Sequence, residues 1–178
     1  MSNPARYSGD LQALIRDIPD FPKPGILFRD LTPLMGHGPA FSETIERLAE
    51  RATQLRPAAV MAIESRGFIF GASVAARLGL AFVPLRKPGK LPHRTRKSVY
   101  DLEYGSDGIE IHEDAVPPGT RVVVIDDLLA TGGTARAAVQ LARELGAEVA
   151  GALFVVELAA LAGRKRLDGV PVDALVVY

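Results

Sequence analysis

Cysteine is absent from the 178 residues of this sequence, which excludes disulfide bonds, thiol nucleophiles and cysteine-ligated metal sites. An excess of one charge sign is also absent, because 21 Lys and Arg residues balance 21 Asp and Glu residues and leave no basic footprint for nucleic acid. No apolar run approaches the length of a membrane span, and the first residues lack the apolar core of a signal peptide. We therefore expect a cytoplasmic protein that binds neither nucleic acid nor a membrane.

Histidine is scarce, and the three that occur, His37, His93 and His112, are too scattered in the sequence to suggest a metal site. The chain also lacks an internal repeat, a low-complexity tract or a linker that would divide it. Its length is ample for one hydrophobic core. We therefore predict that residues 1–178 form a single domain.

A run of β-branched residues over 122–125 predicts a buried strand of a parallel sheet. This strand is predicted to end at two adjacent carboxylates, Asp126 and Asp127. A loop of small residues follows, and then a helical pattern over 135–145 that Gly146 stops. The loop consists of Ala130, Thr131, Gly132, Gly133 and Thr134.

This strand, loop and helix suit a phosphorylated sugar better than an ordinary connecting turn. Backbone N–H groups at the helix N-terminus favour an anion, and the helix dipole adds to the effect. The two loop threonines add hydroxyl donors, and the two glycines let the backbone approach phosphate oxygens closely. The two aspartates can accept hydrogen bonds from ribose hydroxyls, directly or through a metal. The stretch therefore predicts a site for a ribose 5-phosphate.

Strand and helix patterns alternate along most of the chain. Three predicted strand ends, at Ile63, Arg86 and Ile125, are followed by polar residues. The predicted fold class is therefore α/β, an open, mainly parallel sheet flanked by helices, with its site at the carboxyl ends of the strands. The predicted strands cover residues 58–63, 81–86, 122–125, 148–156 and 172–177, and the predicted helices cover residues 41–55, 68–78, 135–145 and 158–167.

The remaining segments have patterns of their own. Apolar residues at helical spacing predict a short helix over 10–18, capped by Asp10. Closely spaced prolines exclude a regular helix over 21–30. Residues 87–105 form a long, basic, breaker-rich segment, which is typical of a functional or disordered loop. Residues 109–112 alternate like an exposed strand that pairs with the end of this segment.

The strand, the Asp-Asp pair and the sequence Ala-Thr-Gly-Gly-Thr are together similar to the phosphoribosyl pyrophosphate signature of the type I phosphoribosyltransferases. The segment around Phe28 resembles the base-binding segment of the adenine phosphoribosyltransferases, and the long basic segment resembles their mobile hood. The resemblance extends from Phe21 to about Leu167. It implies the type I phosphoribosyltransferase fold, with a base-binding segment at about residues 18–35 and a mobile hood at about residues 87–108.

The resemblance also implies a role for individual residues. Those implied to bind the phosphoribosyl group are Asp126, Asp127, Ala130, Thr131, Gly132, Gly133 and Thr134. Those implied to bind pyrophosphate are Ser65, Arg66, Arg86, Lys87 and Lys90. Those implied to bind adenine are Leu27, Phe28, Arg29 and Leu158. Glu103, within Leu-Glu-Tyr-Gly, is the implied catalytic residue, which would assist proton transfer at the purine imidazole.

The residue patterns by themselves leave alternatives open for these positions. Phe28 and Leu158 could be core residues, and Arg66 could form a surface salt bridge. Glu103 could pair with a basic side chain of the hood. Residues 93–97 match no part of the family pattern, so they receive no role.

The implied reaction transfers the 5-phosphoribosyl group from phosphoribosyl pyrophosphate to adenine, giving AMP and pyrophosphate in purine salvage. Magnesium is expected to arrive with the donor substrate and without a direct protein ligand, and the family implies a homodimer. One alternative is a phosphoribosyltransferase for another nucleobase. The other is a regulator that senses phosphoribosyl pyrophosphate while it binds nucleic acid, which would need a helix-turn-helix extension or a basic face. Beyond the hood, the sequence offers neither.

Overall fold

The computed structural model describes residues 7–101 and 106–178. The chain forms two compact units, the first extending to Arg47 and the second running from Leu48 to Tyr178. Within the described residues, no helix has the length and apolar character needed to cross a membrane. The single domain predicted from the sequence stays a prediction.

The first unit contains a short antiparallel strand pair, β1 and β2, in which Arg16 lies opposite Asp30. The helix predicted over residues 10–18 is wrong. Asp10 accepts the N–H of Gln12 at 2.9 Å and starts one 3-10 turn, and the chain then becomes extended because it pairs with β2. The elements are η1 (Gln12–Leu14), β1 (Arg16–Ile18), β2 (Phe28–Asp30), α1 (Thr32–Gly36) and α2 (Gly38–Leu55), of which α2 continues into the second unit.

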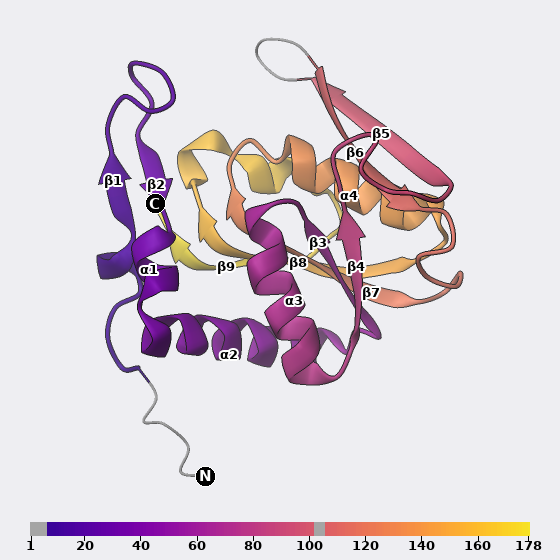
Figure 1. Cartoon of the computed structure of the whole chain (residues 1–178), viewed down its shortest axis with the longest axis horizontal. Helices are drawn as coiled ribbons and strands as arrows, with labels where there is room; N and C mark the ends of the chain where they lie inside the picture. Colours follow the sequence, from indigo (N-terminus) through magenta and orange to yellow (C-terminus); the bar gives the residue numbers. More distant parts are fainter. Residues whose placement is uncertain (1–6, 102–105) are drawn as a thin grey trace. The chain divides into compact units, whose positions relative to one another are not determined.

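The second unit is built on a five-stranded sheet in the order β4-β3-β7-β8-β9, and every neighbouring pair is parallel (Figure 1). This confirms the open parallel α/β sheet predicted from the alternating patterns. The central strands are apolar on both faces because helices cover both faces of a parallel sheet. The strands are β3 (Ala59–Ile63), β4 (Ala81–Leu85), β7 (Arg121–Leu129), β8 (Glu148–Glu157) and β9 (Val172–Val177).

Helix α3 (Arg66–Leu78) joins β3 to β4, and helix α4 (Gly133–Glu144) joins β7 to β8, so the two connections run in opposite directions from the centre of the sheet. Right-handed crossovers then place the two helices on opposite faces. On the α3 face, a Cβ on Gly71 would lie 2.4 Å from Cβ of Ala62. Because the connections from β3 and from β7 proceed toward opposite edges of the sheet, the strand order reverses between these two strands. Ligands of open α/β sheets bind in the crevice at the carboxyl ends of the strands at such a point.

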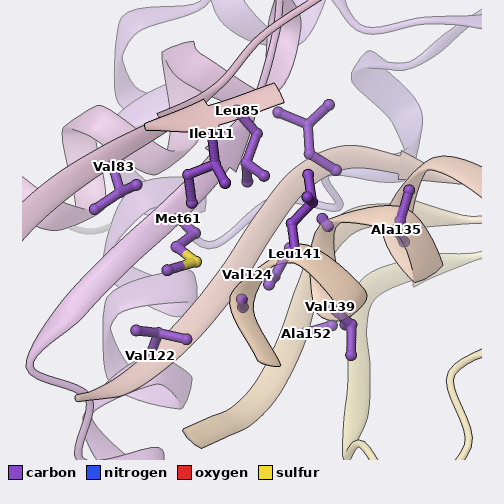
Figure 2. Packing of buried hydrophobic residues seen from close by; sticks show 14 of the residues in the cluster. Met61, Val83, Leu85, Ile111, Val122, Val124, Ala135, Val139, Leu141 and Ala152 are labelled. Carbon is purple, nitrogen blue, oxygen red and sulfur yellow. The ribbon is translucent and has the colours of Figure 1, made fainter. Parts of the chain in front are cut away.

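The core on the α4 face contains fully buried side chains from the sheet and from α4 (Figure 2). Met61 of β3 and Val124 of β7 face Leu141 of α4, and each is completely buried. Burial of side chains of this size contributes roughly 1.5–3 kcal/mol each relative to exposure. This packing holds the strand ends that carry the polar residues in fixed positions.

A two-stranded antiparallel hairpin, β5 (Thr95–Asp101) and β6 (Ser106–His112), follows β4 and contacts α4. The predicted pairing of residues 109–112 with the preceding basic segment is confirmed, since Ile109 lies opposite Ser98. The predicted exposure is wrong. Ile109 and Ile111 are fully buried in the same core as the α4 residues, because the alternating pattern directs one face of the strand inward.

Two other predictions need correction. The central strand does not end at the carboxylates, because β7 stays paired with β8 as far as Leu129 opposite Glu157. The helix predicted over 158–167 is instead two 3-10 turns, η2 (Ala159–Leu161) and η3 (Gly163–Arg166). Ala162 between them has φ +52°, a left-handed conformation that interrupts a right-handed helix.

Candidate functional site

Polar residues lie at or near the carboxyl ends of three neighbouring strands, at the same edge of the sheet. Glu64 comes directly after β3, Arg86 comes directly after β4, and Asp126 lies near the end of β7. Because the three strands are parallel neighbours, their carboxyl ends meet at this edge. The structure therefore brings together the three groups of polar residues that the sequence predicts to carry the site, although Asp126 lies within β7 and not after its end.

The two carboxylates of β7 lie against the N-terminus of α3. The Nε atom of Arg66 is 2.8 Å from Oδ2 of Asp127, and Asp127 is only 5% exposed. A Cβ on Gly67 would lie 2.4 Å from Oδ1 of Asp126, so only glycine allows this close approach. Burial and the adjacent charge of Asp127 raise the pKa of Asp126 well above its ordinary value. The pair thus places two carboxyl groups close together at the start of α3.

The phosphate loop, residues 130–134, connects β7 to α4. It lines a hollow of about 80 Å³ together with Asp126 and Ala135. The first N–H groups of an α-helix have no partner within the helix, so α4 presents donors at this hollow. A much larger hollow of about 650 Å³ lies elsewhere, between α4 and residues 165–168. The phosphate loop is thus marked by its chemistry, not by its volume.

Glycine is required at both sides of a contact behind the phosphate loop. Gly132 has φ +80°, and a Cβ there would lie 2.4 Å from the carbonyl oxygen of Gly163. A Cβ on Gly163 would in turn lie 2.1 Å from the carbonyl oxygen of Ala130. Real Cβ atoms do not approach oxygen atoms this closely, so Gly163 supports the loop by backbone contact. Sequence reasoning missed Gly163, although a glycine inside a predicted helix is a recognised warning.

An ion pair holds Gly163 in place. Arg164 binds Glu157 at the end of β8 through two hydrogen bonds, one of them 3.0 Å from Nε to Oε1, and the Glu157 side chain is only 6% exposed. Two parallel hydrogen bonds between guanidinium and carboxylate fix orientation as well as distance. Between these residues, the half-buried Leu158 donates its N–H to the carbonyl oxygen of Leu129 at 2.9 Å. The predicted base residue Leu158 is therefore tied to the strand that leads into the phosphate loop.

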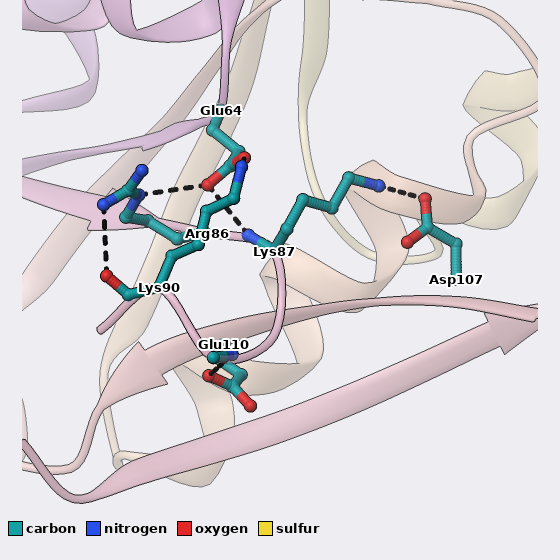
Figure 3. A network of polar contacts seen from close by, with 7 residues as sticks. Glu64, Arg86, Lys87, Lys90, Asp107 and Glu110 are labelled. Carbon is teal, nitrogen blue, oxygen red and sulfur yellow. Dashed lines mark hydrogen bonds and ion pairs between the residues drawn. The ribbon is translucent and has the colours of Figure 1, made fainter. Parts of the chain in front are cut away.

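Glu64 is the centre of a second group of polar residues, which we call the cationic cluster: Arg86, Lys87 and Lys90 around Glu64 (Figure 3). Nε of Arg86 donates to Oε2 of Glu64 at 3.0 Å, and Nζ of Lys90 donates to Oε1 at 2.6 Å. The backbone N–H of Lys87 also donates to Oε2, at 2.9 Å, while its ammonium pairs with Asp107 of β6. Three residues predicted to bind pyrophosphate thus share one carboxylate.

The charge state of Glu64 follows from these contacts. Burial would raise the pKa of Glu64, but the hydrogen bonds from Lys90, the Lys87 backbone and Arg86 together lower it below the ordinary value. Sequence reasoning assigned no role to Glu64, and its position beside Ser65 and Arg66 was the available signal. Ser65 itself is exposed, and the peptide bond between Glu64 and Ser65 is cis.

The predicted base segment lies in the first unit. Phe28 begins β2, is half-buried and packs edge-to-face against Phe21, with ring centroids 5.1 Å apart. Arg29 forms an ion pair with Asp17 of β1, and Leu27 is 45% exposed. The predicted catalytic residue Glu103 lies outside the described residues.

Comparisons with known proteins establish the class of this chain. Residues 35–177 match the family model for the phosphoribosyl transferase domain. A curated adenine phosphoribosyltransferase from Carboxydothermus hydrogenoformans is 58% identical over 169 residues, which cover 95% of this chain and 99% of the relative. The crystal structure of adenine phosphoribosyltransferase from Thermoanaerobacter pseudethanolicus is 50% identical, with a TM-score of 0.92 over 94% of this chain and 98% of that one.

A third similar structure was solved with a ligand bound. The structure of the APRTase from Giardia lamblia, complexed with 9-deazaadenine, is 36% identical with a TM-score of 0.89, over 95% of this chain and 96% of that one. The family model shows that the chain is a phosphoribosyltransferase. Sequence identity at these levels over nearly the full length narrows the assignment to one family of that class. The chain belongs to the adenine phosphoribosyltransferase family.

Proposed function

We propose that this chain transfers the 5-phosphoribosyl group from phosphoribosyl pyrophosphate to adenine, which yields AMP and pyrophosphate. The observation that supports this most directly is the meeting of three features at one sheet edge. These features are the phosphate loop at 130–134, the Asp126–Asp127 carboxylate pair and the cationic cluster. A donor with a 5-phosphate at one end and a pyrophosphate at the other needs these groups at the two ends of its site.

The phosphate loop would hold the 5-phosphate, since the loop supplies backbone N–H groups and the hydroxyls of Thr131 and Thr134. Asp126 and Asp127 would accept hydrogen bonds from the ribose hydroxyls. Their negative charge would also favour the sugar as positive charge builds at C1. Asp127 has Arg66 as its ion-pair partner, whereas burial and the charge of Asp127 raise the pKa of Asp126, so a positive charge on the sugar would favour the ionised form of Asp126.

The cationic cluster would stabilise pyrophosphate as it leaves C1, because negative charge on the leaving oxygens rises during bond cleavage. Arg86 and Lys90 bring their charges to one point through Glu64. Ser65 and Arg66 follow on the same loop. Contacts from these residues to the leaving group would strengthen in the transition state, where the negative charge on pyrophosphate increases. Interactions that strengthen in the transition state raise the rate.

Leu27, Phe28 and Arg29 are the proposed adenine-binding residues of the first unit, with the Phe28 ring stacking on the base and the Leu27 backbone forming hydrogen bonds to it. Leu158 is the proposed adenine contact of the second unit. Glu103 is the proposed group that assists proton transfer at the purine imidazole as the new bond to C1 forms. The edge-to-face contact of Phe28 with Phe21 supports this use, because it fixes the orientation of an aromatic ring that can stack on a base.

Magnesium is proposed to enter with the donor and without a direct protein ligand. The carboxylates near the ribose position fit a nearby cation, since hard oxygen atoms suit magnesium, and the pKa of Asp126 is raised by burial and by the adjacent charge of Asp127. When bound, the ion would neutralise part of the charge of the pyrophosphate group. We further propose that the enzyme acts in purine salvage in the cytoplasm as a homodimer.

A base panel tests the proposal. Pyrophosphate release from phosphoribosyl pyrophosphate should be measured with adenine, hypoxanthine, guanine, xanthine, uracil and orotate. We expect adenine to exceed the other bases by roughly 100-fold or more in kcat/KM, because a site built for one set of hydrogen bonds rejects bases that leave those groups unpaired. A preference for another base would reassign the substrate. Binding of the donor without turnover on any base would indicate a sensing protein instead of an enzyme.

A further inference from the structure

The Glu64 side chain is more deeply buried than the cations that surround it. Its N–H donates to the carbonyl oxygen of Leu85 at 2.9 Å, which continues the β3–β4 pairing, and its side chain is only 8% exposed. The side chains of Arg86 and Lys90 are 35% and 49% exposed. The carboxylate is therefore the fixed member of the cluster, and the long cationic side chains are the members with freedom to move.

Both carboxylate oxygens of Glu64 are occupied by hydrogen bonds. Oε2 accepts from Nε of Arg86 and from the N–H of Lys87, and Oε1 accepts from Nζ of Lys90 (Figure 3). Arg86 also donates through Nη1 to the carbonyl oxygen of Lys90 at 3.1 Å, which closes the group. These charge-assisted bonds satisfy a carboxylate that is largely removed from solvent.

Pyrophosphate would need the same donors. If an anion binds Arg86 and Lys90, only the N–H of Lys87 among these three partners still donates a hydrogen bond to Glu64. An almost buried carboxylate that loses its ionic partners is destabilised, because water does not replace them fully. The free energy of pyrophosphate binding is then reduced by the loss of the Glu64 ion pairs.

We propose that Glu64 is an internal counter-anion that competes with pyrophosphate for Arg86 and Lys90, and that this competition speeds release of the pyrophosphate product. The inference rests on the proposed function for the identity of the anion. Glu64 is then a positioning residue: it acts through the two cations and does not touch the reacting atoms. After transfer, the Glu64 carboxylate forms its ion pairs with Arg86 and Lys90 again. These ion pairs neutralise the positive charge that held pyrophosphate, so pyrophosphate dissociates more readily.

The test compares the wild-type protein with Glu64→Gln, which keeps the shape and the acceptor for Lys87 but removes the charge. Calorimetry should show inorganic pyrophosphate binding about 10-fold more tightly to the variant, the scale of one charge-assisted hydrogen bond. Steady-state turnover should fall by a similar factor while the first-turnover rate stays within about twofold, which gives a burst of AMP. Weaker or unchanged pyrophosphate binding would overturn the competition.

The matched control is Glu110→Gln, which removes the same charge from the neighbouring strand β6. Glu110 accepts the N–H of Gly89 at 3.1 Å and contributes a side chain to the same region (Figure 3). If this variant tightened pyrophosphate binding as much as Glu64→Gln, net charge alone would explain the effect, and the specific role of Glu64 would be rejected.

A crystal structure of the wild-type protein with pyrophosphate needs no variant to fold. We expect Nε of Arg86 and Nζ of Lys90 to contact phosphate oxygens and to lie farther from Glu64 than 3.0 and 2.6 Å. Retention of both ion pairs with bound pyrophosphate would overturn the inference. Lack of adenine-dependent pyrophosphate release by the wild-type protein would instead overturn the proposed function, so the two failures are distinguishable.

Discussion

The phosphate loop and the cationic cluster lie at the same edge of one sheet but are constructed in different ways. The loop is shaped by backbone contacts, in which Gly132 and Gly163 approach so closely that a methyl group on either one would collide with the other segment. The cluster is shaped by side chains, in which long cations converge on the carboxylate of Glu64. A backbone site is rigid and responds to steric change, whereas a side-chain site is adaptable and responds to charge.

This difference suits the two ends of the proposed donor. The 5-phosphate stays on the product ribose, so its site needs to remain fixed throughout the reaction. The pyrophosphate separates from the sugar, so its site must bind an anion and then release it. The following predictions are designed to break one region while leaving the other intact.

The largest effect is expected for Gly163→Ala. The added Cβ would lie 2.1 Å from the carbonyl oxygen of Ala130 and 2.9 Å from the backbone nitrogen of Gly132, so the phosphate loop must shift. Displacement of a binding group by about 1 Å commonly costs on the order of 100-fold in rate, and we expect a loss of this size in kcat/KM for phosphoribosyl pyrophosphate. Affinity for inorganic pyrophosphate should change less than about twofold.

Steady-state kinetics and calorimetry with ribose 5-phosphate and pyrophosphate check this prediction. Gly38→Ala is the control, because a Cβ at Gly38 would meet no atom within 4 Å. Equal losses of ribose 5-phosphate and pyrophosphate affinity in Gly163→Ala would show that the two regions are not independent.

The second effect, at Asp126→Asn, should separate stability from activity. Turnover should fall by roughly 100-fold, the scale of a lost electrostatic contact in a transition state. The variant should nevertheless melt about 2–4 °C higher near pH 7.5 if about 1 kcal/mol of repulsion is removed.

The direction of this change with pH follows from the raised pKa of Asp126. The native state holds the Asp126 proton more tightly than the unfolded state does, so wild-type stability falls as pH rises from about 4 through the raised pKa. The advantage of Asp126→Asn should therefore be present near pH 7.5 and vanish below about pH 4. Thermal unfolding monitored by circular dichroism across this range measures it. A constant advantage at every pH would reject the electrostatic explanation.

The smallest effect is expected for Lys90→Gln in the cationic cluster. Lys90 is half-exposed and shares its charge with Glu64, so its removal should weaken pyrophosphate binding only about three- to tenfold. The loss should shrink at high ionic strength, because salt screens exposed charges. Titration of pyrophosphate at about 0.05 and 0.5 M salt tests this, with Lys97→Gln as a control that removes an exposed hood charge. Salt dependence as steep in Lys90→Gln as in the wild type would argue against a direct role.

Much of the fold was predictable because it depends on local patterns. The run over 122–125 is apolar enough to specify a buried strand, and the pattern over 172–177 specifies a short strand. The helix predicted after the phosphate loop is present as α4, which ends at Glu144 shortly before Gly146. Residues 10–18 were mispredicted because their helical spacing was overridden by pairing with β2. Residues 109–112 were predicted as exposed because alternation identifies two faces but not which neighbour covers them.

The sequence by itself determined the order of the strands of the parallel sheet along the chain, the polar residues near three of their carboxyl ends and the chemistry of the phosphate loop, because each depends on residues close together in the chain. Only the tertiary structure decided that Glu64 gathers Arg86 and Lys90, that Arg66 meets Asp127, and that Gly163 supports the loop. These contacts join residues on different strands and turns. Their existence depends on sheet order and packing distances of a few ångströms, which no pattern along a single chain encodes.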